Sequence, residues 1–403
     1  MIIMVINTGS SSIKYQLIEM DHERVLIKGT LECIGMDIST HTIIDENRNK
    51  SISKSIIKNH RDGMAAIIHF LTNCGSQHIP YINQISAVGH RVAHGGEQLT
   101  DASLITDEVI GIIEKVNALA PLHNPPILMA IKACREILQH VPMVAVFDTA
   151  FHKTIPEYAY IYPIPYNVYT KYGIRRYGFH GTSHRFVAKC ASEYMGKPLT
   201  SLRMITCHIG NGSSMTAICY GQSIDTSMGF TPLEGIPMGT RSGTIDPSII
   251  PFLMEKERMT STEINKLLNN NSGMLGISGI SSDLRIITAA AEQGDARAKL
   301  SLEILSYSIK KYIGAYCAIM DGIDCLVFTA GIGENSSVIR EKSCQELRFF
   351  GVRINAEKNL VANGGTKTVH DISADDSKVK ILVIPTNEEL AIARETLAAL
   401  QQA

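Results

Sequence analysis

The chain has 403 residues, of which 45% are hydrophobic and 19% are charged, and its formal net charge is −1. This length predicts two or three domains of a globular protein. The balanced charge gives no support for a nucleic-acid footprint, which needs a clustered basic excess. The sequence contains no run of 18 apolar residues, so no membrane span is expected.

The first 150 residues predict a meander of strands followed by alternating helices and strands. Short runs that alternate in polarity indicate strands, and apolar residues at helical spacing indicate helices. Thr106 is expected to cap its helix, and Asp148 to stand just past the end of a buried parallel strand. In chain order we expect strands over 13–20, 23–31 and 41–45, a helix over 63–71, a strand entering a glycine loop over 85–96, a helix over 107–116 and a strand over 143–147.

Around residue 204 the opening pattern returns. The Gly-Ser-Ser triplet at 212–214 lies between an apolar strand and an alternating strand, as the triplet at 9–11 does. The division between domains is expected near residues 148–151, and the final helix is expected to pack back onto the first domain. Beyond the second triplet we expect a helix over 296–320, a strand with a glycine loop over 325–336, a helix over 338–351, and a strand, turn and helix over 378–400.

Both glycine–serine turns join two strands, whereas the turns of P-loop and Rossmann sites lead into a helix. The backbone N–H groups of such a turn converge on an anion, glycine admits the anion close to the main chain, and serine hydroxyls add donors. Two such turns in related halves predict a nucleotide held in a cleft between two domains.

Other short motifs do not support a different chemistry. The HRD at 60–62 lacks the Asn of a protein-kinase catalytic loop, residues 331–336 lack the third glycine of GxGxxG, and residues 181–185 are not the GxSxG of a hydrolase. His90 and His94 are four residues apart, but no Glu completes HExxH, so hydrogen bonding around the glycine loop is the favoured interpretation. Nine scattered cysteines without a CxxC pair indicate reduced thiols in a cytoplasmic protein.

Several polar segments are poorly explained by core packing. Each alone could be a turn, a cap or an ion pair, but their joint presence in this order is informative. The longest are NTGSSSIK (7–14), RRYGFHGTSH (175–184), DTSMGFTPLEG (225–235), MGTRSG (238–243) and GIGENS (331–336). With these motifs, nearly the whole chain closely resembles the acetate kinase family, which includes propionate kinases.

The resemblance implies a two-domain α/β fold of the actin, Hsp70 and sugar-kinase superfamily (ribonuclease H-like), with a duplicated core and nucleotide in the interdomain cleft. It implies one domain over residues 1–150 with about 387–403, and a second over 151–386 with the nucleotide site and dimer interface. The implied reaction is a reversible in-line phosphoryl transfer between ATP and a short-chain carboxylate, giving ADP and an acyl phosphate. Mg²⁺ is the implied cofactor, and the implied form is a cytoplasmic homodimer.

By position, Arg91, Asp148, His180 and Arg241 resemble the catalytic residues of the family. Guanidinium forks can hold carboxylate and phosphoryl oxygens that repel each other, and His180 resembles the residue that stabilises the transferring phosphoryl group. Asp148 resembles the aspartate that orients an arginine and the acyl end of the substrate. General-base catalysis by Asp148 is the weaker assignment, because acetate is already ionised at pH 7.

Asn7 and Glu388 resemble the magnesium ligands, since Mg²⁺ prefers oxygen and retains water. Thr386 and Glu389 fit a helix capping box, which leaves Glu388 free for the metal. The residues that resemble the nucleotide contacts are Ser10, Ser12, Lys14, His208, Ile209, Gly210, Asn211, Gly212, Asp283, Leu284, Arg285, Gly331, Ile332, Gly333, Glu334 and Asn335.

The small-acid pocket implied by the resemblance is lined by Arg91, Ala93, Leu122, Phe179 and Pro232. Many acetate kinases have Val where Ala93 stands, so the missing methyl groups could admit propionate, unless a neighbour fills the space. A dedicated propionate kinase is therefore an alternative. An actin-like or Hsp70-like switch would not require this catalytic set, and a sugar kinase would need a polar pocket.

Overall fold

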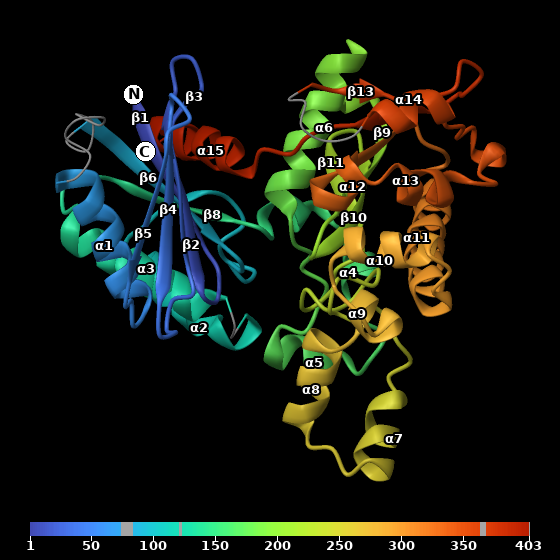
Figure 1. Cartoon of the computed structure of the whole chain (residues 1–403), viewed down its shortest axis with the longest axis horizontal. Helices are drawn as coiled ribbons and strands as arrows, with labels where there is room; N and C mark the ends of the chain where they lie inside the picture. The colour runs from blue at the N-terminus through green and yellow to red at the C-terminus, as the bar shows by residue number, and fades with distance from the viewer. Residues whose placement is uncertain (74–83, 121–122, 363–367, 403) are drawn as a thin grey trace. The chain divides into compact units, whose positions relative to one another are not determined.

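The computed structural model describes residues 1–73, 84–120, 123–362 and 368–402. The chain forms two compact units, which we call unit 1 (Met1–Ala150 with Asn387–Ala403) and unit 2 (Phe151–Thr386) (Figure 1). Each unit is built on one mixed sheet. In the part of the chain that is described, no helix is long and apolar enough to cross a membrane.

The sheet of unit 1 has eight strands in the order β5-β4-β3-β2-β1-β6-β8-β7. Strands β1 to β5 pair antiparallel with their neighbours in sequence, whereas β6 pairs parallel with β1 and β8. The expected meander and the buried parallel strand are therefore confirmed. The strands are β1 (Ile2–Thr8), β2 (Ser12–Glu19), β3 (Arg24–Glu32), β4 (Ser39–Asp45), β5 (Lys50–Ser55), β6 (Ile85–Val92), β7 (Ser103–Leu104) and β8 (Met143–Phe147).

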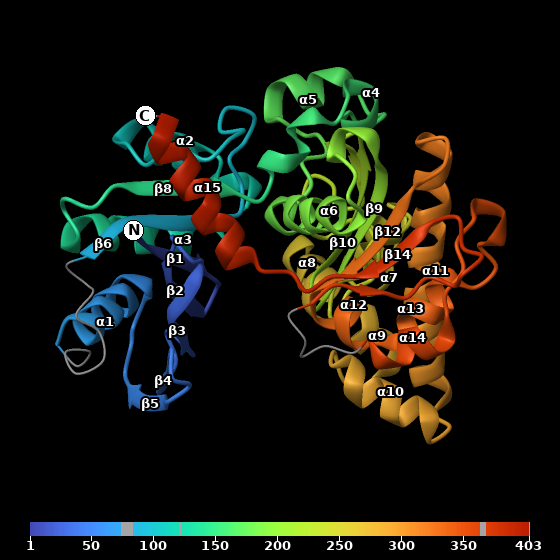
Figure 2. The ribbon, with the colours of Figure 1, turned by 90° about the horizontal axis from the view of Figure 1, so that it is seen from above.

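Helices cover both faces of this sheet, because alternate residues of its central strands are apolar on both sides. Ile2, Met4 and Ile6 of β1 belong to the core with α1 and α3, whereas Ile3 and Val5 pack with α15. Figure 2 shows α15 crossing the central strands of this sheet. The side-chain oxygen of Thr106 accepts a hydrogen bond from Val109 N at 3.2 Å, which confirms the expected cap of α2. The helices of unit 1 are α1 (His60–Asn73), α2 (Asp107–Lys115), η3 (Asn117–Leu119), α3 (Asn124–Ile137) and α15 (Glu388–Gln402).

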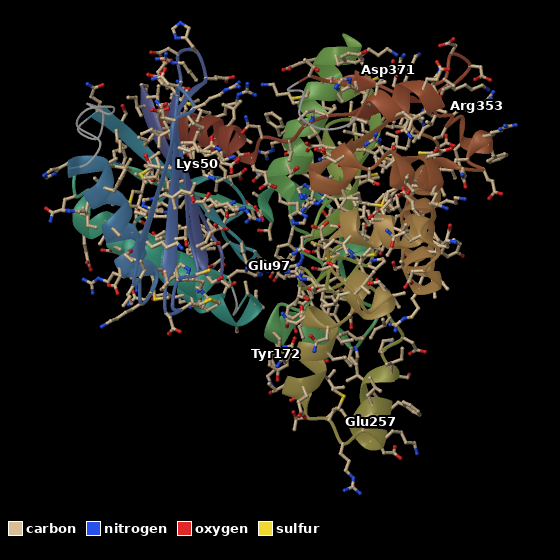
Figure 3. The ribbon with its side chains drawn as sticks, in the orientation of Figure 1. Lys50, Glu97, Tyr172, Glu257, Arg353 and Asp371 are labelled. Carbon is tan, nitrogen blue, oxygen red and sulfur yellow. The ribbon has the colours of Figure 1, made fainter. Side chains whose placement is uncertain are left out.

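The outer edge of the unit 1 sheet is polar. Strand β5 is the edge strand, and all six of its residues are exposed. Its sequence carries Lys50, labelled in Figure 3, and Lys54. Charged lysines on an edge strand discourage pairing with the edge of another chain.

The sheet of unit 2 has six strands in the order β11-β10-β9-β12-β14-β13. Strand β9 pairs antiparallel with β10 and parallel with β12, which pairs parallel with β14. The order β11-β10-β9-β12-β14 thus has the same strand directions as β3-β2-β1-β6-β8 of unit 1, which confirms the duplicated core. The strands are β9 (Arg203–Ile209), β10 (Ser213–Cys219), β11 (Gln222–Thr226), β12 (Cys325–Thr329), β13 (His370–Asp371) and β14 (Lys380–Val383).

Helix α6 covers one face of the unit 2 sheet, and α10, α11 and α13 belong to the core on the other face (Figure 1). The helices are α4 (Glu157–Tyr160), α5 (Tyr166–Tyr172), α6 (Gly181–Met195), α7 (Ile249–Lys256), α8 (Ser261–Asn270), α9 (Gly273–Ser278), α10 (Leu284–Glu292), α11 (Ala296–Ile319), α12 (Ala330–Asn335), α13 (Ser337–Cys344) and α14 (Ala356–Val361). Short 3₁₀ turns are η4 (Ala150–Thr154), η5 (Leu199–Ser201) and η6 (Arg348–Phe350).

Two expectations for unit 2 are wrong. The segment expected as a glycine loop over 331–336 is mostly the short helix α12. The helix expected over 338–351 ends at Cys344, because Gln345 is extended and Glu346 has a positive φ of 63°. That backbone turn leaves η6 as a separate element.

Candidate active site

Three polar residues of unit 1 lie in a row across adjacent strands. Asn7 of β1 is paired with Lys14 of β2 on one side and with Arg91 of β6 on the other. Asn7 and Arg91 continue the sheet face whose apolar residues pack under α15, because side chains alternate along a strand. The row of polar residues therefore lies directly beyond the apolar residues of that face that pack against α15.

Arg91 and Asp148 form a bidentate ion pair. Nε and Nη2 of Arg91 donate to the two carboxylate oxygens of Asp148 at 3.0 and 2.5 Å, and Nη1 donates to Oδ1 of Asn7 at 3.1 Å. Burial alone would lower the pKa of Arg91, but the charges of Asp148 and Glu388 more than offset it, and the net pKa is raised. Arg91 is thus held as a rigid cation with its fork oriented.

Glu388 is the first residue of α15 and belongs to the same cluster. Burial raises the pKa of its carboxyl, Arg91 and Lys14 oppose that rise, and Asp148 and Glu389 add to it. The expected capping box is wrong: Leu390 N donates to Oδ1 of Asn387, and the hydroxyl of Thr386 bonds Ser183 instead. Glu388 is still free of a capping bond among the described contacts.

The unit 1 cluster suits a cation. Three carboxylates (Asp148, Glu388 and Glu389) act on one another there, against the two cationic side chains Arg91 and Lys14. An amide oxygen, Asn7 Oδ1, adds a further oxygen donor of the kind that Mg²⁺ prefers. The donor set is therefore compatible with the magnesium site expected at Asn7 and Glu388.

The first glycine–serine turn joins β1 to β2. Gly9 N donates to the carbonyl of Ser12 at 2.8 Å and closes the turn, and the ring Nε2 of His60 bonds the Gly9 carbonyl at 2.8 Å. A Cβ added to Gly9 would lie 2.8 Å from Ser12 Oγ, so a larger residue would displace that hydroxyl. Ser10 and Lys14 are exposed on the turn and on β2.

The second turn, between β9 and β10, lies beside two of the expected catalytic residues. A Cβ added to Gly212 would be 3.6 Å from Nε2 of His180 and 3.7 Å from Nη1 of Arg241. The missing side chain of Gly212 thus leaves a space that both donors border. Ser213 Oγ closes the turn by accepting from Gly210 N at 3.1 Å and donating to the Gly210 carbonyl at 2.9 Å.

Arg241 has no carboxylate partner among the described residues. Its Nη1 donates to the carbonyl of Pro232 at 3.3 Å and lies 3.9 Å from the sulfur of Met238. Burial lowers its pKa, although a guanidinium stays charged. Phe179, Met228 and Met238 form a small buried apolar cluster beside it. A cation without a counter-charge next to apolar side chains is suited to a small organic anion.

His180 stands at the start of α6 in the left-handed region, with φ 56° and ψ 23°. Its Nδ1 bonds Ser214 Oγ at 2.8 Å, and its ring stacks on that of His208 with centroids 4.2 Å apart. The Nδ1 of His208 bonds Ser183 Oγ at 2.8 Å. A sparsely populated backbone conformation held by such contacts is typical of functional positions.

A cavity of about 840 Å³ lies between α10, α12 and the start of α13. Of the expected nucleotide contacts it is lined by Asn211, Asp283, Leu284, Arg285, Gly331, Ile332 and Asn335, and its other lining residues are Ser282, Thr288, Ala289, Glu292, Ser336, Ser337 and Val338. Arg285 pairs with Asp283 at 2.6 Å and is largely exposed, so it can move towards a ligand.

The other nine expected nucleotide contacts lie outside that lining, and five of them have been described above: Ser10, Ser12, Lys14, His208 and Gly212. Ile209 is wholly buried in the core of unit 2. Gly210 faces α12, where an added Cβ would be 3.7 Å from that of Ala330. The carbonyls of Gly333 and Glu334 accept hydrogen bonds from the buried guanidinium of Arg340, both at 2.9 Å.

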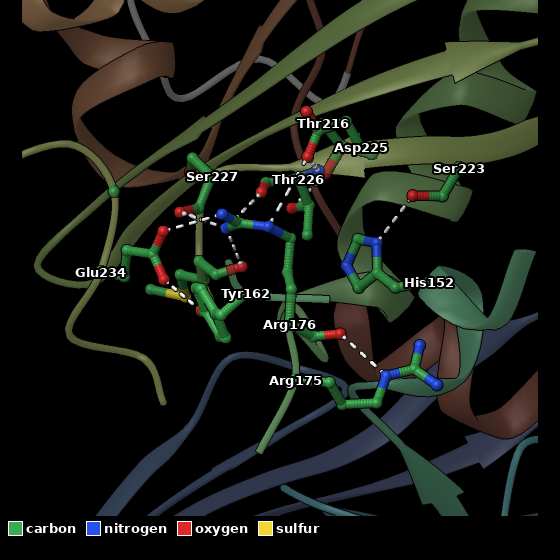
Figure 4. Close-up of polar contacts among 12 residues, drawn as sticks. His152, Tyr162, Arg175, Arg176, Thr216, Ser223, Asp225, Thr226, Ser227 and Glu234 are labelled. Carbon is green, nitrogen blue, oxygen red and sulfur yellow. Dashed lines mark hydrogen bonds and ion pairs between the residues drawn. The ribbon is translucent and has the colours of Figure 1, made fainter. Parts of the chain in front are cut away.

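The segment that carries Pro232 surrounds a second half-buried arginine, Arg176 (Figure 4). Nη1 of Arg176 donates to the carbonyls of Thr226, Ser227 and Met228 at 3.0, 3.3 and 3.1 Å, and its Nη2 donates to Glu234 at 2.8 Å. The hydroxyl of Tyr162 donates to the same Glu234 carboxylate. Arg176 therefore holds both ends of the segment 226–234, which contains Pro232.

The expected pocket residues fall in both units. Ala93 is buried after the end of β6 in a cluster with Leu99 and Phe147, and Leu122 lies outside the described residues. Phe179 and the carbonyl of Pro232 lie beside Arg241. In unit 2, Phe179 and Pro232 of the expected pocket thus lie beside Arg241, which was expected as a catalytic residue.

Sequence reasoning missed the polar residues behind the site. His184, Thr206 and Ser214 are hydrogen-bonded to one another next to His180, and the Nε2 of His152 bonds the Phe179 carbonyl at 3.0 Å. The sequence signals that could have indicated these residues are the GTSH that follows His180 and the Gly-Ser-Ser triplet at 212–214. Whether these residues form hydrogen bonds with one another depends on how α6 packs across the sheet. The hydrophobic periodicity of the sequence does not determine that packing.

A family model described as the acetokinase family matches residues 2–394 of the chain. The chain is 52% identical over 395 residues to an acetate kinase of Acetivibrio thermocellus, covering 98% of both sequences, and 54% identical over 397 residues to an acetate kinase of Thermotoga maritima, covering 98% of this chain and 97% of the relative.

Solved structures agree with these sequence relatives. An acetate kinase of Porphyromonas gingivalis is 44% identical, with a TM-score of 0.94 and coverage of 99% of both chains. A propionate kinase of Francisella tularensis is 40% identical, with a TM-score of 0.91 and coverage of 98% of this chain and 99% of that one. Because the family model matches residues 2–394 and the relatives are similar over nearly the whole chain, the chain belongs to the acetokinase family.

Proposed function

We propose that the chain transfers a phosphoryl group reversibly between ATP and acetate, with ADP and acetyl phosphate as the other pair. The observation that carries the proposal is the half-buried guanidinium of Arg241, which borders the space beside His180 and Gly212 and has no carboxylate partner among the described residues. Membership of a family whose curated relatives are acetate kinases supports the same activity.

In unit 2, Arg241 and His180 would stabilise charge on the transferring phosphoryl group. Phosphoryl transfer depends mainly on positioning and on charge stabilisation, and both groups are held by neighbouring contacts before substrate binds. The cavity along α10 and α12 would take the nucleoside part of ATP, with Asp283, Arg285 and Asn335 at its wall.

In unit 1, Arg91 would hold the acyl end of the substrate, and Asp148 would orient Arg91 rather than remove a proton. Both carboxylate oxygens of Asp148 already accept from Arg91, so orientation is the role that its contacts support. Asn7 and Glu388 would hold Mg²⁺, which supplies neutralisation of phosphate charge when bound. Ser10, Ser12 and Lys14 would contact phosphate from the first glycine–serine turn.

Steady-state kinetics with ATP and Mg²⁺, with acyl phosphate trapped by hydroxylamine, tests the proposal. We expect acetyl phosphate from the wild type and a fall in kcat of about 10²–10³ in Arg241→Ala. The control is Arg135→Ala, because Arg135 forms an exposed ion pair with Asp107. ATP binding without acyl phosphate from any acid would favour an ATP switch or a sugar kinase.

Propionate is a second candidate substrate, favoured by Ala93. The neighbour with a TM-score of 0.91 is a propionate kinase. We expect Ala93→Val to lower kcat/KM for propionate relative to acetate by about 10-fold or more, since one methylene in such a pocket is worth about 1–3 kcal/mol. An unchanged ratio would mean that neighbours of Ala93 have already filled the space.

We propose that the protein is a homodimer that associates through the apolar surface of unit 2. Helix α7 has no buried residue, and Ile249, Phe252 and Met254 are exposed on it; Glu257, labelled in Figure 3, follows the helix. Exposed apolar patches of this kind mark interfaces. Sedimentation should give a dimer for the wild type and a monomer for Phe252→Glu, whereas a wild-type monomer would contradict the proposal.

A cytoplasmic location also fits the proposed substrates, since ATP is supplied there. The described cysteines are free thiols, and burial raises the pKa of those at Cys134 and Cys325. Such thiols are protonated and unreactive, as expected of a protein in a reducing compartment.

A further inference from the structure

Behind His180 lies a chain of hydrogen bonds, which we call the histidine relay and define as Thr206, His184, Ser214 and His180. Thr206 Oγ1 lies 2.7 Å from Nδ1 of His184, whose Nε2 lies 2.8 Å from Ser214 Oγ. The same Ser214 oxygen lies 2.8 Å from Nδ1 of His180. The relay is contained within unit 2, between the sheet and the start of α6.

The proton count of the relay limits its arrangement. His184 is wholly buried, and burial holds its pKa well below the usual value, so the ring is neutral and carries one N–H. Ser214 has one hydroxyl proton for two ring partners, so it donates to one histidine and accepts from the other. Two directions of donation along the relay are therefore possible.

Thr206 decides between the two directions. It is wholly buried, and among the described residues its hydroxyl has one hydrogen-bond partner, Nδ1 of His184. If His184 carried its proton on Nδ1, the Thr206 proton would have no acceptor, and a buried unpaired donor is costly. Thr206 therefore donates to Nδ1, and His184 carries its proton on Nε2.

We propose that His184 and Ser214 are positioning residues that hold His180 in the tautomer with its proton on Nε2. Because His184 donates to Ser214, the hydroxyl of Ser214 must donate to Nδ1 of His180. The remaining proton of a neutral His180 is then on Nε2, the atom that borders the space beside Gly212 and Arg241. His180 is thereby prepared as a hydrogen-bond donor to an anion.

Other contacts hold the His180 ring in the orientation that the relay requires. The ring stacks on His208 at an angle of 20°. The preceding carbonyl, that of Phe179, accepts from Nε2 of His152, whose Nδ1 bonds Ser223 Oγ at 2.9 Å. Orientation and tautomer of His180 are thus determined by separate groups, as in histidines of known catalytic sites.

The inference rests on the donor role of His180 in the proposed function, and its first test does not depend on activity. Protein labelled with ¹⁵N in its histidine rings is studied by NMR, and the His180 signals are identified by their loss in His180→Gln. We expect Nδ1 to resonate as an unprotonated nitrogen and Nε2 as a protonated one. A protonated Nδ1 in the neutral ring would overturn the proposal.

Kinetics of Ser214 variants give the second test. Ser214→Ala should lower kcat by about 10-fold or more while KM changes little, which is less than the roughly 10²–10³ expected from loss of the His180 donor itself. Ser214→Thr keeps the hydroxyl and should recover most of the kcat. The control is Thr216→Val, which removes a buried hydroxyl of the same strand that bonds Thr226 and no histidine.

Wild-type kcat in Ser214→Ala, or an equal loss in Thr216→Val, would overturn the positioning role. If Ser214→Ala does not fold, the tautomer measured in the wild type decides the matter alone. Full kcat in His180→Gln would instead reject the proposed role of His180 in catalysis, and the NMR spectrum would still report the direction of the relay.

Discussion

Two arginines expected at the active site are held in opposite ways. Arg91 is bound bidentately by Asp148, whereas Arg241 has only neutral partners in the described part of the chain. A paired guanidinium is fixed in direction and its charge is partly neutralised, whereas an unpaired, half-buried guanidinium attracts an anion more strongly. In the proposed function, Arg241 is therefore the residue at which binding would stabilise phosphoryl or carboxylate charge most.

Gly212→Ala tests whether the space beside Arg241 and His180 is used. The new methyl group would lie 3.6 Å from the His180 ring and 3.7 Å from Arg241, which is ordinary contact without a clash. We expect the melting temperature to stay within about 2 °C while kcat falls at least about 10-fold, because the methyl group would occupy the space that the proposed function gives to a phosphoryl oxygen.

The control for Gly212→Ala is Gly111→Ala. An added Cβ at Gly111 of α2 meets nothing within 4 Å. Equal kcat values for the wild type and Gly212→Ala would show that the reacting group does not pass beside Gly212.

At the scale of elements, one buried side chain of α13 holds the C-terminal end of α12 in place. Arg340 of α13 is wholly buried, and its guanidinium donates to the carbonyls of Gly333, Glu334, Asn359 and Ala362 and to the side-chain oxygen of Asn359. Burial lowers its pKa to about 10, so it is still charged at neutral pH. One side chain thus fixes the end of α12 and the end of α14 together.

Arg340→Lys should weaken nucleotide binding. Lysine has three donors and cannot match the fork, so some of the carbonyls lose a partner at about 1–3 kcal/mol each. We expect the Kd for ADP, measured by calorimetry, to rise about 10-fold, with a smaller change in the KM for acetate. Glu341→Ala, at an exposed neighbour on α13, is the control, and an unchanged Kd in Arg340→Lys would contradict the supporting role.

The elements were largely predictable because their signals are local. The alternation of polarity in the strands and the two Gly-Ser-Ser triplets predict the hairpins β1–β2 and β9–β10. Thr106 predicts the start of α2. The row of Asn7, Lys14 and Arg91 was not predictable, since it depends on the register between three strands. The prediction of a capping box at Thr386 was wrong for a similar reason. The Thr386 hydroxyl forms a hydrogen bond with Ser183, a residue distant in sequence.

At the scale of the whole molecule, buried neutral histidines should limit stability in acid. Burial lowers the pKa of His41 and His152 to about 4 and that of His90 to about 3. Between these values and about 6.5 the unfolded chain binds more protons than the folded one, so stability falls as the pH falls through this range. Above about pH 6.5 these histidines do not make the free energy of unfolding depend on pH.

Urea midpoints measured from pH 7.5 to 4.5 test this expectation. Each such histidine adds at most about 1.4 kcal/mol per pH unit to the slope of the free energy of unfolding against pH. His41→Gln should make the fall shallower by roughly that amount, whereas His22→Gln should not, because His22 is largely exposed. Parallel curves for the wild type and His41→Gln would contradict the assignment to buried histidines.

Unit 1 is assembled from two stretches of chain that are separated by all of unit 2. The sheet face of Ile3, Val5, Val144 and Val146 packs against Ile392 and Ala393 of α15. On the ribosome, residues 151–386 must be made before α15 exists, a delay on the order of tens of seconds at usual synthesis rates. A nascent chain of this protein therefore carries an uncovered apolar sheet face throughout that time, which is the kind of surface that chaperones bind.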